Sequence, residues 1–169
     1  MGLLAAILGY FGYERFAKSQ LVWGAPVKGH DLLRAASVDG PLGVRTLGGA
    51  LGLDASALNA RVVEKLRTGI AEPWLRIEAA PPAGRNPFSL VYVFDVLPES
   101  RPDFAAICAG TLPLQDPRAA DVNVHVVLCG PNGPVVAMRG WTKRPATADD
   151  AALGRTIVQT GLSALRGDT

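Results

Sequence analysis

Hydrophobic and polar residues alternate over residues 121–143. In the first half of this segment every second position is apolar, with Asn123 and His125 between the valines. This is the period of a half-buried strand. Residues 130–133 (GPNG) are typical of a turn, because proline presets one φ angle and Asn-Gly tolerates a positive φ. A second apolar run follows over residues 135–138. The pattern predicts a β-hairpin around which a sheet is organised.

Two stretches repeat apolar residues at helical spacing. Residues 54–68 do so, and Asp54 or Ser56 can cap the first turn of the predicted helix. Residues 147–166 do so with Gly154 and Gly161 on the apolar side, where they would let the helix backbone lie close to a sheet. Together with the strand pattern, the helical stripes predict a core that contains Leu58, Val62, Leu66, Ile157, Leu162, Val124, Val126, Val91 and Val93.

Three further apolar runs predict strands. Residues 74–78 alternate, and residues 88–97 are apolar on both faces, as in a strand covered from two sides. Residues 104–114 are broken by Gly110 and Pro113, which favours a bulged or edge strand.

This order of elements predicts an α+β fold: a single domain with a mostly antiparallel β-sheet of about 4–5 strands and helices packed on one face. Short connections between residues 74 and 143 favour antiparallel pairing, because a parallel crossover needs about a dozen residues or more. We divide the chain into an apolar N-terminal helix (1–20), an irregular Gly/Pro-rich arm (21–52) and the α+β domain (53–169).

The N-terminal segment 1–13 has no charged side chain. It is shorter than the about 20 residues of a membrane span, and it has neither a basic n-region nor the small-x-small cleavage site of a secretory signal. We expect an apolar helix that packs on the core, on another subunit or in a bilayer interface. Its apolar side would be formed by Leu4, Ile7, Leu8 and Phe11.

Composition adds little to this picture. Hydrophobic residues make up 49% and charged residues 19%, with a net charge of +2. A surface poor in charge is typical of proteins that meet a partner or a membrane, and the scattered cations create no field suited to a polyanion.

Cys108 and Cys129 lie in apolar runs and are expected as buried thiols, with a disulfide between neighbouring strands as the alternative. Both a cytoplasmic and a cell-envelope location stay open.

Candidate chemistry is sparse. His30 and His125 are the only histidines, and without a Cys-x-x-Cys or His-x-x-x-His motif we expect no metal site. The glycine clusters lack the flanking strand and the Lys-Ser/Thr pair of a phosphate cradle, so no cofactor is expected. One catalytic hypothesis remains: His125 as a general base oriented by Asp95, with the thiolate of Cys108 as the nucleophile. A partly exposed strand histidine without a catalytic role is the favoured alternative.

Three cations surround an aromatic residue at the end of the hairpin: Arg139, Lys143 and Arg144 beside Trp141. A base could stack on the indole while the cations contact phosphates, as in binders of single-stranded nucleic acid. We favour a solvated hairpin end, with Trp141 closing the edge of the core.

These observations favour a non-catalytic binding or assembly subunit of bacterial type. Its partner would be another protein or further copies of the chain, met through the apolar N-terminal helix, the irregular arm with Trp23 and a sheet edge; residues 1–18 could also touch a membrane peripherally. The order of elements over about residues 54–166 resembles that of accessory lipoproteins in bacterial outer-membrane transport and secretion machines. This resemblance implies an accessory role in an envelope complex. A small Cys/His/Asp enzyme is the first alternative and a weak nucleic-acid binder the second.

Overall fold

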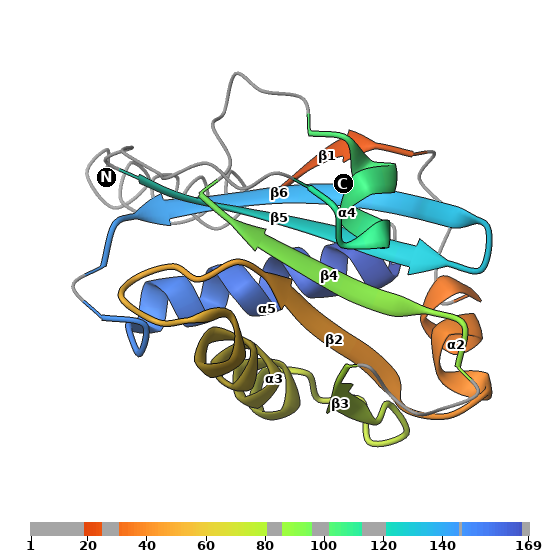
Figure 1. The fold of residues 1–169 in the computed structure, drawn as a ribbon. Helices are drawn as coiled ribbons and strands as arrows, with labels where there is room; N and C mark the ends of the chain where they lie inside the picture. Colours follow the sequence, from red (N-terminus) through yellow and green to blue (C-terminus); the bar gives the residue numbers. More distant parts are fainter. Residues whose placement is uncertain are drawn as a thin grey trace, which may run out of the picture.

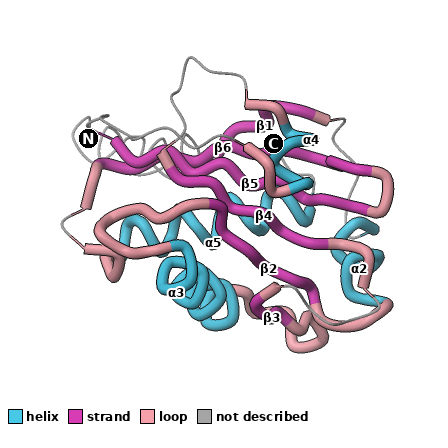
Figure 2. Tube along the Cα trace, viewed as in Figure 1, coloured by secondary structure: helices cyan, strands magenta, loops and turns pink. Residues whose placement is uncertain are grey.

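The computed structural model describes residues 19–24, 31–80, 86–95, 102–112, 121–145 and 147–166. They form a β-sheet with helices on both faces (Figure 1 and Figure 2). In chain order the elements are β1 (Ser19–Trp23), α2 (Asp31–Val38), β2 (Leu42–Leu47), α3 (Ala55–Gly69), β3 (Ile77–Ala79), β4 (Ser89–Phe94), α4 (Phe104–Ala109), β5 (Asp121–Gly130), β6 (Gly133–Lys143) and α5 (Ala151–Arg166).

The described strands form a six-stranded sheet in the order β1-β6-β5-β4-β2-β3. The predicted hairpin is confirmed as β5 and β6, which pair up to Gly130 and Gly133 at the turn. β4 and β1 extend the hairpin with antiparallel pairing, whereas β2 is parallel to both of its neighbours, β4 and β3. The α+β class is therefore confirmed, but the mostly antiparallel sheet of four to five strands is wrong. α3 lies in the connection between β2 and β4 and gives it the length that a parallel crossover requires.

Helices α3 and α5 pack on one face of the sheet, and α2 contacts α5 (Figure 1). Of the two predicted caps it is Asp54 that caps α3: its Oδ1 accepts a hydrogen bond from the backbone N–H of Ala57 at 2.8 Å. Asp150 caps α5 in the same way, through the N–H groups of Ala152 at 2.7 Å and Leu153 at 3.0 Å. These bonds satisfy donors that the first turn of a helix leaves free.

Residues 104–109 form α4, a helix where the sequence analysis expects a strand. Asp103 caps it by accepting hydrogen bonds from two N–H groups of the first turn at 2.9 and 3.1 Å, and Gly110 ends it in the left-handed conformation. Its buried Phe104 and Ile107 face the sheet from the side opposite α3 and α5. The prediction that helices cover only one face is therefore also wrong.

Each face of the sheet has its own hydrophobic cluster. The larger one lies under α3 and α5, and the smaller one under α4. Successive residues of a strand alternate between the two, because their side chains point to opposite faces: Tyr92 of β4 belongs to the larger cluster and Val93 to the smaller. Of the nine predicted core residues, eight are buried. The exception is Leu162, which is half-buried at the rim of the larger cluster.

Gly161 lets α5 lie close to β4, as expected for a glycine at that position. A β-carbon on Gly161 would overlap the hydroxyl of Tyr92, which donates a hydrogen bond to the carbonyl oxygen of Ile157 at 3.1 Å. Gly154 does not face the sheet. A β-carbon there would lie 3.4 Å from Cδ of Lys65 on α3. One glycine therefore serves packing on the sheet and the other serves packing between two helices.

Residues 21–52, which we expected to form an irregular arm, contain α2 and β2. Gly40 and Gly48 have positive φ angles of 128° and 73° and turn the chain just before and just after β2, whose Leu42 and Val44 are buried. These glycines therefore lie at the two ends of a strand, whereas the sequence analysis interprets them as signs of an irregular segment. The predicted N-terminal helix falls almost entirely outside the described residues. Among the described helices, none is long and apolar enough to cross a membrane.

Candidate functional site

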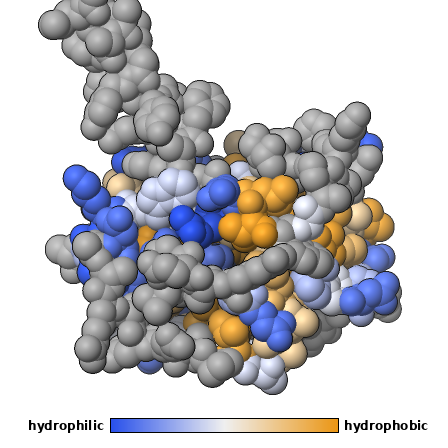
Figure 3. All heavy atoms as spheres, turned by 90° about the horizontal axis from the view of Figure 1, so that it is seen from above, coloured by the Kyte–Doolittle hydropathy of each residue, from blue (hydrophilic) through white to orange (hydrophobic). Residues whose placement is uncertain are grey.

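The face of the sheet below α4 has an apolar half and a polar half. On the hairpin it is formed by cross-strand pairs: Val127 with Ala137, His125 with Arg139, and Asn123 with Trp141. α4 packs on the first of these pairs, and the two polar pairs lie further from the hairpin turn. Figure 3 views the molecule from this side, and in the part of the face that is described the hydrophobic residues form separate patches bounded by hydrophilic ones.

Cys108 of α4 and Cys129 of β5 form a disulfide, with their Cα atoms 5.7 Å apart. The expectation of two buried thiols is wrong, because α4 places Cys108 directly over β5. Arg45 of β2 holds the same end of the helix. Its Nη2 donates to the carbonyl oxygen of Cys108 and, at 3.5 Å, to that of Ile107, which satisfies acceptors that the last turn of a helix leaves free.

His125 is 2% exposed, so the expectation of a partly exposed strand histidine is wrong. Burial lowers the pKa of His125 to about 4, and the positive charge of Arg139 opposite it acts in the same direction. Its Nδ1 is buried without a hydrogen-bond partner. The imidazole is therefore neutral at pH 7, and no carboxylate among the described residues orients it.

Asp95 pairs with Arg144 and not with His125. Its Oδ1 accepts a hydrogen bond from Nη2 of Arg144 at 2.9 Å, and the carboxylate side chain is 1% exposed. Burial raises the pKa of Asp95, while the hydrogen bond and the charge of Arg144 partly offset this effect. The residue has a φ of 60° and donates its N–H to the carbonyl oxygen of Asn123 at 2.6 Å, which fixes the end of β4 against β5.

The three catalytic candidates are thus held in separate contacts. Cys108 has no thiolate because it is in the disulfide, and the other half of that disulfide, Cys129, is four residues from His125 on β5, about 13 Å along the strand. Among the described residues, no group of three or more His, Cys, Asp or Glu could hold a metal ion. The described geometry does not bring a nucleophile beside a base, which is the arrangement that covalent catalysis requires.

The buried imidazole predicts a pH-dependent stability. In the unfolded chain the pKa of His125 returns to about 6.5, so between about pH 6.5 and the folded pKa of about 4 the unfolded state binds a proton that the folded state does not. The free energy of unfolding should therefore fall as the pH falls through this window, by about 2.5 kcal/mol at pH 4.5. Urea unfolding at pH 7 and at pH 4.5 measures this loss.

His125→Gln is the matched control, because glutamine keeps a polar side chain that does not titrate. His30 and Asp95 are present in both proteins, so their titration cancels in the comparison. We expect the variant to lose about 2.5 kcal/mol less than the wild type between the two pH values. The same pH dependence in both proteins would contradict a buried, neutral His125.

The cationic and aromatic residues of the hairpin do not form one binding strip. Arg139 stacks on Trp141, with its guanidinium carbon 5.3 Å from the ring centroid. Arg144 is in the ion pair with Asp95, and Lys143 is exposed at the end of β6, opposite an aspartate of β5. The remaining sequence-predicted binding residues cannot be placed at a site: the side chain of Trp23 and all of Leu4, Ile7, Leu8 and Phe11 lie outside the described part of the chain.

Two large hydrophobic side chains are exposed in the described part of the chain: Val38 by 75% and Trp74 by 44%. Val38 ends α2 shortly before β2, and Trp74 lies shortly before β3. These two strands are parallel, with Leu42 opposite Ile77, so both side chains lie at the end of the sheet where β2 and β3 begin. We call Val38 and Trp74 the apolar end.

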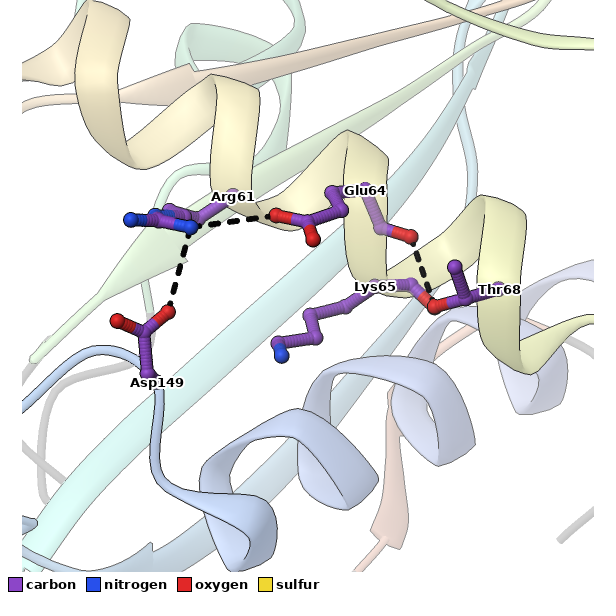
Figure 4. Close-up of polar contacts among 5 residues, drawn as sticks. All are labelled: Arg61, Glu64, Lys65, Thr68 and Asp149. Carbon is purple, nitrogen blue, oxygen red and sulfur yellow. Dashed lines mark hydrogen bonds and ion pairs between the residues drawn. The ribbon is translucent and has the colours of Figure 1, made fainter.

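A groove of about 330 Å³ lies between α3 and α5. Figure 4 shows the charged residues beside it: Arg61 makes ion pairs with Glu64 and with Asp149, each at 3.4 Å, and Lys65 extends between the two helices. The groove is lined by Lys65, Thr68, Gly69, Ala151, Gly154, Arg155, Val158 and Gln159.

No family model matches the chain, and no curated protein matches it. Among solved structures, the chain is similar to the PelC dodecamer from Paraburkholderia phytofirmans in two crystal forms, one of them of a point variant. Both are 13% identical to this chain with a TM-score of 0.46, and the matches cover 89% of this chain and 99% and 98% of those chains.

The sequence analysis missed both the apolar end and the groove. It places Trp74 in a strand and Val38 in the irregular arm, although Pro73 directly before the tryptophan is typical of a turn. The groove depends on α3 and α5 lying side by side, which no local pattern reveals. Its one sequence signal is the pair Gly69 and Gly154, two glycines in helices that are otherwise well patterned.

Proposed function

We propose that the chain is a non-catalytic assembly subunit whose copies associate through the apolar end. The observation that carries this proposal is the position of Val38 and Trp74, the two large hydrophobic side chains exposed among the described residues, at the same end of the sheet. A partner that covers this end of the sheet would remove both side chains from water, which favours association. Tryptophan is also among the residue types enriched in the positions that dominate binding energy at protein interfaces.

The state of the candidate catalytic residues supports the same proposal. Cys108 forms a disulfide and Asp95 forms an ion pair. His125 is buried in the sheet. All three residues are therefore part of the packed fold. The apolar segment 1–18 remains a second candidate contact, with another protein or with a membrane surface. The disulfide favours the cell-envelope alternative for location, because disulfides persist in oxidising compartments and are rare in the cytosol.

Sedimentation velocity on the full chain tests the proposal. From about 1 μM to about 1 mM, a range that covers association free energies from about −8 to −4 kcal/mol, we expect the wild type to rise above the monomer mass. Val38→Ser combined with Trp74→Ser should weaken this association at least about tenfold, since both side chains lose the apolar surface that they bury in the complex. Circular dichroism should show an unchanged fold.

Ala57→Ser is the matched control, because Ala57 is exposed on α3 away from the apolar end. It should associate like the wild type. A wild type that stays monomeric over the whole range, or a double variant that associates as strongly as the wild type, would contradict the proposal.

A further inference from the structure

We propose that the groove between α3 and α5 is the receptor for the end of α2 of a neighbouring copy. Val38 would lie on the floor of the groove, and the carboxylate of Asp39 would lie against Lys65 and Arg155. This inference rests on the proposed assembly function and specifies which two surfaces meet. The argument comes from the shape of the groove, its charge, and the chemistry of the α2 end, which we define as Val38 and Asp39.

The floor of the groove is apolar and free of bulky side chains. At Gly69 a β-carbon would lie 2.5 Å from Cγ2 of Val158, so only glycine lets the end of α3 approach α5 this closely. At Gly154 the nearest side chain is the aliphatic stem of Lys65, 3.4 Å from where a β-carbon would stand. The exposed surface of the groove is mostly apolar, although Thr68 and Gln159 also line it. Such a surface suits an aliphatic side chain such as that of valine.

The groove has two positive charges and no negative one. Lys65 and Arg155 belong to its lining, and neither makes an ion pair with a described carboxylate. The nearby acids Glu64 and Asp149 share a single arginine, Arg61 (Figure 4), so together these three residues leave one negative charge beside the two cations. Among these described residues one positive charge remains in excess, and an occupant that brings one carboxylate would balance it.

The α2 end has the complementary chemistry. Val38 is 75% exposed, and the next residue, Asp39, is exposed and makes no ion pair with a described residue. An aliphatic side chain and a carboxylate thus project from adjacent positions at the end of a helix. A small molecule would remain largely in water in so open a groove, whereas well-formed ligand pockets bury about 70–90% of a ligand. A protein segment can cover both the groove and the surface around it.

The two surfaces are separate on one molecule. The groove is formed by α3 and the first half of α5, and Figure 1 shows α2 beside the other end of α5. A contact between two different surfaces is heterologous. Repeated from copy to copy, it closes into a ring or extends into a filament, and it does not stop at a symmetric dimer.

Charge reversal tests the pairing, with sedimentation velocity as the readout. One variant carries Lys65→Glu and Arg155→Glu, and the other carries Asp39→Lys. Each alone places like charges on both surfaces and should weaken association at least about tenfold, equivalent to about 1.4 kcal/mol. A 1:1 mixture of the two variants places opposite charges on both contacts and should restore the assembly. Lys143→Glu, on the other face of the sheet, is the control and should associate like the wild type.

The outcomes separate this inference from the proposed function. If Val38→Ser with Trp74→Ser disrupts association while the reversals do not, the copies associate but the groove is not the receptor. If both reversals disrupt association and their mixture does not restore it, the pairing of Asp39 with Lys65 and Arg155 is overturned. If the wild type is monomeric, both proposals fall. Melting curves of each folded variant exclude unfolding as the cause.

Discussion

Replacing Cys108 and Cys129 together by alanine is expected to lower the free energy of unfolding by about 3 kcal/mol. The disulfide closes a loop with a sequence separation of 21 residues, and the entropy that this loop removes from the unfolded chain accounts for a loss of this size in the loop-closure model. Urea unfolding at neutral pH measures the loss.

Among the described elements, α4 should be the one whose structure depends most on the disulfide. This helix has six residues, too few to be stable alone, so its position depends on the disulfide, on buried Phe104 and Ile107, and on the contact of Arg45 with its last turn. Reduction of the wild type should reproduce the loss, and the double variant should not respond to reductant. Equal unfolding free energies for the oxidised and reduced wild type would contradict this account.

The elements that the sequence predicted well are those with a local signature of several turns or alternations. The hairpin repeats its pattern over two long strands joined by a turn sequence, and α3 has both an apolar stripe and Asp54 at its start. In such segments periodicity and capping agree, and packing on the sheet follows from the same stripe.

α4 and β2 were misjudged because their apolar residues are too few to show a period. In α4 the decisive features are single residues at its two ends, Asp103 and Gly110, whereas the run between them reads equally well as a strand. In β2 the flanking glycines suggested an irregular segment, and its parallel pairing with β4 joins residues that are distant in the sequence. Such pairing is decided by the tertiary fold.

The candidate sites show the same limit. The sequence suggested a site from residue types, yet the fold places Cys108 against Cys129 and Asp95 against Arg144. The disulfide depends on how α4 packs on β5, and the ion pair joins the ends of β4 and β6, which β5 separates in the sheet. The α3–α5 groove likewise exists only when two helices far apart in the sequence pack side by side.

Leucines three positions apart on α5 give the second large effect. Leu165 is 0% exposed, so Leu165→Ala should cost about 2–5 kcal/mol, through the lost apolar contacts and the cavity left behind. Leu162 is half-buried at the rim of the same cluster. Water already reaches part of its side chain and can enter the space left by truncation, so Leu162→Ala should cost only about 1 kcal/mol.

The two substitutions remove the same atoms from the same helix, so most of the change in helix propensity cancels in the comparison. Urea unfolding of both variants therefore isolates the effect of burial. A loss at Leu162 as large as the loss at Leu165 would mean that α5 is rotated on the sheet relative to the packing seen here. That rotation would also move Gly161 away from Tyr92, and with it the close approach that only a glycine allows.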